Sequence, residues 1–213
     1  SKFTLKRVGG GRRRRVGLKR RVNKIARRVK NLEQSRDWKT VDHTIGATNI
    51  VNTGNVDWVS FVDIGDLEDE RTGNEIAIGS LQIDGVITQD NAGANVCNVS
   101  VYLVIDKDSN DAKPTIAGLL ESATPLSHIN VNSLNQYRIL RKFQTTVSDS
   151  DKGRNFHFYY KWKKQLKTGF NDNAPVQATG VGAETNHLYL VTIGDLAAAW
   201  PQIKYDCRLR YTD

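Results

Sequence analysis

The residues with the clearest chemistry in this sequence are cations gathered in one segment. Residues 1–36 contain 15 of the chain's 31 Lys and Arg side chains and one acid, Glu33, which gives this segment a net charge of +14. The whole chain carries +8, so the remaining 177 residues carry −6. Guanidinium and ammonium groups bind phosphate oxygens, and clustered cations repel one another unless a polyanion neutralises them. We therefore predict a nucleic-acid-binding arm whose phosphate-binding residues are Arg12, Arg13, Arg14, Arg15, Lys19, Arg20, Arg21, Lys24, Arg27, Arg28 and Lys30.

An apolar pattern runs through the same segment. Apolar residues recur at spacings of four, three, four and three, which predicts a short amphipathic helix over about residues 18–34. Its other faces are cationic and it spans only two heptads, so we expect it to form together with a partner. A disordered tail that serves only as a nuclear-import signal is the alternative, although import alone does not explain the apolar seam. The seam residues are Leu18, Val22, Ile25, Val29 and Leu32.

Aromatic and basic residues interleave over residues 154–164. Such a run can stack bases and hold phosphates. Alternation places Phe156, Phe158, Tyr160 and Trp162 on one face, as a buried strand requires, so packing in the core is favoured for these four. The residues on the opposite face or just past it are predicted to form a secondary contact with nucleic acid or with another subunit; they are His157, Tyr159, Lys161, Lys163 and Lys164.

Motifs for catalysis or metal binding are not found, so we predict no enzyme activity, no cofactor and no metal site. The four histidines are isolated, and the sequence lacks a Cys-X-X-Cys pair, a phosphate-binding loop and a nucleophile elbow. The run from Asp106 to Asp111 begins like a calcium loop, but Asp111 stands where Gly is needed and Ala117 where a bidentate Glu is needed. A solvated connection is favoured there, with calcium shared between subunits left open. Cys97 and Cys207 are predicted to be buried thiols.

The elements that position these side chains are predicted from residue 41 onward, where apolar and polar residues alternate. A phase slip near Gly79 predicts a bulge, and a short helix is expected over 115–121 within the long connection 107–135. No segment is apolar and long enough to span a membrane. The pattern predicts an all-β, single eight-stranded antiparallel jelly-roll sandwich over residues 37–213, preceded by the basic arm, residues 1–36. The predicted strands are 41–51, 56–65, 75–88, 96–106, 136–147, 154–163, 187–195 and 205–213.

Three stretches resemble the capsid proteins of small circular single-stranded DNA viruses, the circovirus and geminivirus group. Gln136–Phe143 (QYRILRKF) is similar to a strand of that family, Asn186–Val191 (NHLYLV) resembles its penultimate strand, and Lys204–Asp213 (KYDCRLRYTD) resembles its closing strand. The arm, a heptad helix after a basic tract, resembles that of satellite tobacco necrosis virus coat protein, which belongs to an RNA virus.

The resemblance implies a capsid protein that assembles with copies of itself into a small icosahedral shell of sixty subunits. It implies that the arm packages single-stranded nucleic acid, with DNA favoured over RNA. The expected location is the virion, with the host nucleus during assembly, and no membrane partner is expected. The alternative is a non-viral nucleic-acid-binding β-sandwich module with a cationic tail. A carbohydrate-active jelly-roll enzyme is disfavoured because no paired carboxylates could be placed.

Overall fold

The computed structural model describes residues 21–25, 38–89, 96–197 and 200–213. The chain divides into two compact units, Ser1–Trp38 and Lys39–Asp213. In the first unit, residues 21–25 are helical and exposed. They fall inside the predicted helix 18–34, whose remaining length lies outside the described residues, as does the predicted boundary between residues 36 and 37.

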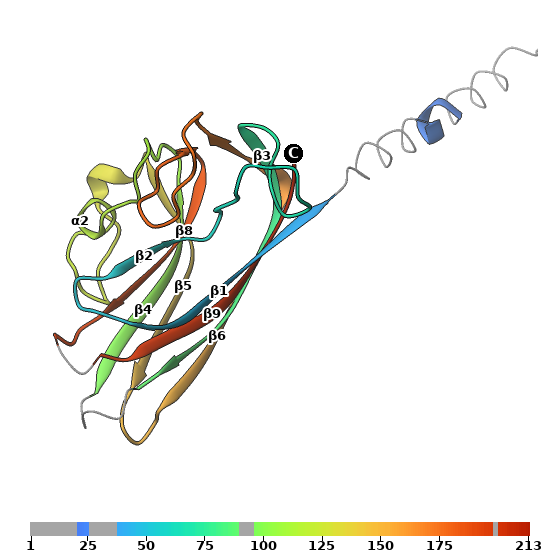
Figure 1. Ribbon diagram of the computed structural model, residues 1–213. Coiled ribbons are helices and arrows are strands. Elements are labelled where there is room, and N and C mark those ends of the chain that lie inside the picture. Colours follow the sequence, from blue (N-terminus) through green and yellow to red (C-terminus); the bar gives the residue numbers. More distant parts are fainter. Residues whose placement is uncertain (1–20, 26–37, 90–95, 198–199) are drawn as a thin grey trace, which may run out of the picture. The chain divides into compact units, whose positions relative to one another are not determined.

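The second unit is built almost entirely of antiparallel strands, as predicted from the alternation (Figure 1). Apart from the four-residue helix α2 and the 3₁₀ turn η1, its described elements are strands. The elements are β1 (Lys39–Asn49), β2 (Asn55–Trp58), β3 (Glu75–Thr88), β4 (Cys97–Asp106), α2 (Ile116–Leu119), η1 (Val131–Ser133), β5 (Tyr137–Val147), β6 (Gly153–Phe170), β7 (Ala183–Thr185), β8 (His187–Gly194) and β9 (Gln202–Thr212).

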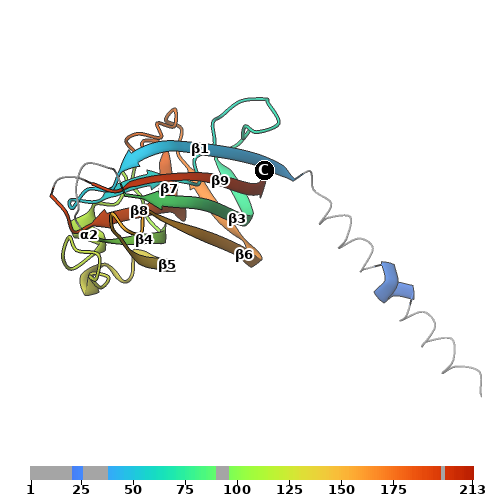
Figure 2. The ribbon, with the colours of Figure 1, turned by 90° about the horizontal axis from the view of Figure 1, so that it is seen from below.

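The strands form two sheets. One has the order β1-β9-β3-β6-β7 and the other the order β2-β8-β4-β5, and all of these pairings are antiparallel. Figure 2 shows β1, β9, β3 and β6 side by side over the second layer. Four of the pairs are nested in the sequence: β1 with β9, β2 with β8, β3 with β6, and β4 with β5. The chain therefore runs out through four strands and returns along the same four partners.

The main core lies between the two sheets. Alternate residues of β4 and β9 are buried there, and so are Phe156 and Phe158 of β6, as predicted from the alternation. Tyr160 and Trp162, predicted to face the core as well, are half-buried and pack against it. The buried inward residues of β4 and β9 are Cys97, Val99, Val101, Leu103, Ile105, Tyr205, Cys207, Leu209 and Tyr211.

The two sheets differ in what covers their outer faces. On β4 and β8 both faces are buried, because a second apolar cluster, built from Tyr102, Val104 and Leu119 among others, covers the outer face of the four-stranded sheet. The predicted short helix appears there as α2, whose first turn is capped by the Thr115 hydroxyl accepting from Gly118 N at 3.1 Å. On the five-stranded sheet, the strands alternate buried and exposed residues, so its outer face is open to solvent.

The strand count and several boundaries differ from the prediction. The structure has nine strands among the described residues, because β7, with three residues, is too short to show a period and pairs only with the end of β6. The predicted strand 56–65 ends at Trp58, and the predicted strand 154–163 extends to Phe170. The predicted bulge near Gly79 is confirmed, since the register of β3 shifts between Ile78 and Ser80 against both of its neighbours.

A buried polar network stands at one end of the core. His187 is fully buried, accepts the indole N–H of Trp58 on Nδ1 at 3.1 Å and donates from Nε2 to Gly169 O at 2.7 Å. Both ring nitrogens are therefore engaged by a neutral imidazole. Burial, and to a smaller extent the positive charge of Arg71, lowers the pKa of His187 to about 4.

We expect this histidine to make the body less stable in mild acid. Its pKa in the folded state lies below the ordinary value of about 6.5, so the unfolded chain binds the proton first. The free energy of unfolding should therefore fall by about 1.4 kcal/mol for each pH unit between about 6.5 and 4, relative to a His187→Gln variant that does not titrate. Urea denaturation of both proteins at pH 7 and pH 5 measures this difference, and parallel pH dependences would contradict it.

The core assignment predicts a sharp difference between the two faces of β9. Leu209 is fully buried, so Leu209→Asp places an unpaired carboxylate in the core, at a cost above about 4 kcal/mol, and should yield no folded soluble protein. Lys204→Asp, on the exposed face of the same strand, should leave the fold intact. Gel filtration and circular dichroism compare the two variants, and a folded Leu209→Asp protein would show that the face is wrongly assigned.

Candidate nucleic-acid interface

Few of the residues predicted to bind phosphate belong to the described part of the arm. Arg21 and Lys24 lie in the helical residues 21–25 and are exposed. The seam residues Val22 and Ile25 are 55% and 61% exposed. The other predicted arm residues lie outside the described residues; they are Arg12, Arg13, Arg14, Arg15, Leu18, Lys19, Arg20, Arg27, Arg28, Val29, Lys30 and Leu32.

The predicted secondary contact is found on one long strand. Lys161, Lys163 and Lys164 lie in the second half of β6 and are exposed. Tyr159 is also exposed, at 48%, and shares the outer face of the sheet with Lys161. The alternation that buries Phe156 and Phe158 therefore turns Tyr159 and Lys161 toward solvent.

A bulge in β6 displays two of these lysines. In the register with β3, Lys161 faces Ser80, and the next pair joins Leu166 to Ile78. Four residues of β6, 162–165, therefore stand opposite one residue of β3, residue 79. Such bulges bend the strand and re-aim side chains. Here the extra residues allow Lys163 and Lys164, which are consecutive, both to be exposed.

Cations from the second sheet lie along the same side of the sandwich. Strand β5 ends the four-stranded sheet, and Arg141 of β5 reaches β6, with its guanidinium 5.2 Å from the ring centre of Tyr160 and Nη2 3.5 Å from Tyr159 O. A cation over an aromatic ring is held electrostatically. We name the group the β5–β6 basic edge; its residues are Arg138, Arg141, Lys142, Lys161, Lys163 and Lys164, all of them exposed.

The rest of the outer face carries acids that are already partnered. Asp42 accepts from Arg208 at 2.7 and 2.8 Å, and this hydrogen bonding lowers the pKa of Asp42. Asp206 accepts from the Thr44 hydroxyl at 2.7 Å. The Asp42–Arg208 ion pair is exposed and contributes little to stability, and the Thr44 hydroxyl leaves the negative charge of Asp206 in place.

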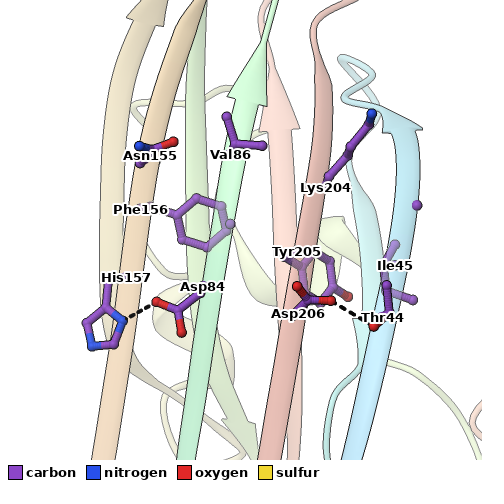
Figure 3. Close-up of a pocket in the computed structure, with 12 residues that line it drawn as sticks. Thr44, Ile45, Asp84, Val86, Asn155, Phe156, His157, Lys204, Tyr205 and Asp206 are labelled. Atoms are coloured by element: carbon purple, nitrogen blue, oxygen red, sulfur yellow. Dashed lines mark hydrogen bonds and ion pairs between the residues drawn. The ribbon is translucent and has the colours of Figure 1, made fainter.

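A hollow of about 620 Å³ crosses this acidic part of the sheet (Figure 3). Asp84 stands beside His157, whose Nδ1 is 2.5 Å from the carboxylate, and hydrogen bonds from Gln82 and His157 lower the pKa of Asp84. Asp84 and Asp206 are direct cross-strand neighbours. Two carboxylates on the floor repel phosphate, so the hollow is excluded as a site for nucleic acid.

The predicted solvated connection after β4 is held by hydrogen bonds to side chains. Asp111 accepts from Gly182 N at 2.8 Å and from the Asn171 amide, and the hydrogen bond from Gly182 lowers its pKa. Asp106 is buried, which raises its pKa. Within residues 21–25, 38–89, 96–197 and 200–213, no group of three His, Cys, Asp or Glu side chains is placed to hold a metal ion.

The remaining candidates for chemistry are engaged in structural contacts. His43 bonds to Phe61 O at 2.8 Å. Cys97 and Cys207 are free and buried as predicted, and burial raises the pKa of the Cys97 thiol to about 11. Among the helices of the described residues, none has the length and apolar character to cross a membrane.

Comparison with family models gives a match that spans most of the chain. The model of the Geminivirus coat protein/nuclear export factor BR1 family matches residues 1–194, which leaves β9 outside the match. A comparison with curated proteins finds no match.

Solved virus structures show a distant likeness. A structure of Desmodium yellow mottle tymovirus is 6% identical over 82% of this chain and 86% of that chain, with a TM-score of 0.36. The unassembled KI polyomavirus VP1 pentamer is 11% identical over 82% of this chain and 73% of that chain, with a TM-score of 0.15.

Proposed function

Because the chain belongs to the Geminivirus coat protein/nuclear export factor BR1 family, we propose that it is a shell-forming coat protein that packages single-stranded DNA. The prediction that the chain is a structural protein and not an enzyme agrees with a coat-protein family. The expected location is accordingly the virion, with passage through the host nucleus during assembly.

The observation that carries the proposal is the separation of charge between two compact units. Residues 1–36 carry +14, and the other residues carry −6 on a body that has its own core. A cationic arm on a mildly acidic body suits a shell that encloses a polyanion, because bodies without excess cations can pack around the charge that the arms neutralise.

The nested strand pairing supports a jelly roll as the shell-forming fold. In a jelly roll two Greek keys place the strands in two facing sheets. The pairs β1 with β9, β2 with β8, β3 with β6 and β4 with β5 have this arrangement, with β7 as a short addition at one edge. The predicted eight strands correspond to these four pairs.

Copies of the chain itself are the proposed partners, in a closed shell of sixty. Several apolar side chains that the body leaves exposed lie in loops, where they are available to contacts between subunits. Closed symmetric assemblies bury such residues repeatedly. Those in the loops and turns are Ile64, Leu67, Leu126, Val131, Leu134 and Val176.

A second function is favoured by the name of the family, which also includes a nuclear export factor. Such a protein would carry nucleic acid as a monomer or small oligomer. Sedimentation of the purified chain separates the two proposals, since sixty copies of a 23.9 kDa chain form a particle of about 1.4 MDa. A species near 24 kDa that binds DNA would reject the shell and favour the carrier.

Deletion of residues 1–36 should abolish packaging while leaving the body folded. The deletion changes the net charge from +8 to −6, which replaces attraction for phosphate with repulsion. We expect particles or subunits whose 260/280 nm absorbance ratio is that of protein alone. The intact chain should bind single strands with a log–log salt slope of roughly −0.7 per neutralised phosphate. An unchanged absorbance ratio after the deletion would show that another part of the chain packages nucleic acid.

The apolar seam should matter for assembly separately from charge. We propose that arm helices from three copies meet through this seam, since β-branched residues occupy three of its five positions and suit a trimer. Ile25→Asp with Val29→Asp should then lower particle yield and melting temperature, although affinity for DNA stays near normal. Asn23→Asp with Gln34→Asp is the control, because it changes the net charge equally and leaves the seam intact. Equal yields from the two variants would show that the arm acts through charge alone.

A further inference from the structure

We propose that the body carries its own single-strand site, in which Lys161, Lys163 and Lys164 bind phosphates and Tyr159 stacks on a base. The inference rests on the proposed packaging function, since it names a second surface that contacts the strand bound by the arm. The ligand class is single-stranded nucleic acid and not duplex, because a base must be free to stack.

The first observation is the position of this surface relative to the start of the body. Thr40, the second residue of β1, faces Arg210 of β9, which faces Ser80 of β3, which faces Lys161 of β6. Three strand spacings separate Thr40 from Lys161, about 14 Å. A strand held by the arm, which joins the body at Lys39, is therefore within a short reach of the β5–β6 basic edge.

The second observation is that these cations lack partners of opposite charge. Two exposed cations elsewhere on the five-stranded sheet are neutralised: Arg208 pairs with Asp42 at 2.7 Å, and Lys167 pairs with Glu75 at 2.8 Å. Among the described residues, Lys161, Lys163 and Lys164 make no ion pair or hydrogen bond. Cations kept close together without counter-charge gain most from an incoming polyanion.

The third observation is the exposed aromatic ring among them. Tyr159 lies two residues before Lys161 on the same face, about 6.6 Å away along the strand. Arg141 contacts only the backbone of Tyr159, because its guanidinium lies over the ring of Tyr160 on the other face of β6, so the outer surface of the Tyr159 ring stays free. An aromatic platform flanked by cations is the combination with which proteins bind single strands without reading their sequence.

Lysines on edge strands also have a simpler role, since they prevent sheets from pairing edge to edge. That role accounts for charge at β5 and β6, but it requires neither a bulge that exposes two consecutive lysines nor an exposed Tyr159. A contact with another subunit is the remaining alternative. Both alternatives predict effects on aggregation or assembly, and neither predicts an effect on the salt dependence of DNA binding.

The test uses the full chain and two triple variants with equal net charge. Lys161→Gln, Lys163→Gln and Lys164→Gln together lower the net charge from +8 to +5, and so do Lys107→Gln, Lys152→Gln and Lys204→Gln, which change exposed lysines elsewhere on the body. Binding of fluorescent oligothymidylate is measured over a series of salt concentrations. We expect the first triple to reduce the log–log salt slope by about 2, at roughly 0.7 per lost phosphate contact, and the second to leave it unchanged. Equal slopes for the two triples overturn the inference, as does a loss of particles without a change in slope.

A second pair of variants keeps the inference testable if the lysine variant aggregates. Tyr159→Ala should weaken oligothymidylate binding by about five-fold or more, and Tyr159→Phe, which keeps the ring, should bind as the intact chain does. Equal affinities for these two variants overturn the stacking role. If the intact chain itself shows no salt-dependent binding, the proposed packaging function fails. If it binds but neither comparison shows a difference, the body site alone is rejected.

Discussion

The antiparallel pairing of β1 with β9 is the constraint on which the rest of the body depends. It brings the first strand beside the last, so that β9 lies between β1 and β3 in the five-stranded sheet. Lys39 at the start of β1 and Asp213 after β9 are joined by an ion pair of 2.8 Å. Because β1 begins where the arm ends, this pairing also fixes the place on the body from which the arm extends.

The four-stranded and five-stranded sheets differ in what they contribute to the protein. The strands β4 and β8 of the four-stranded sheet are buried on both faces, between the main core and the segment that contains α2, so they contribute mainly stability. The five-stranded sheet has one open face, on which acidic and basic side chains occupy different parts. Acids are partnered around the hollow of Figure 3, and cations without partners lie toward the bulge of β6. An open sheet with this division presents one end that suits phosphate and another that repels it.

Alternation predicted most of the fold because one buried face leaves a period of two in the sequence. It predicted β9 and the bulge at Gly79, where the apolar phase slips. It missed the burial of both faces of β4, although the continuous apolar run Val101–Ile105 is the usual signal for a strand covered on both sides. The extra residues that β6 contributes to the bulge could not be predicted, because lysines there do not continue the alternation of apolar and polar residues. The network around His187 joins residues distant in the sequence, and no local pattern reports such contacts.

Nested pairing has a consequence for folding during synthesis on the ribosome. The partner of β1 is the last strand to be synthesised, and about 170 residues separate Lys39 from its partner Tyr211. At roughly 5–20 residues per second, β1 waits on the order of ten to thirty seconds for β9. During that interval β3 also lacks one neighbour and its edge is open to other chains. The body therefore closes only after β9 has been synthesised, because β1 and β3 both pair with it.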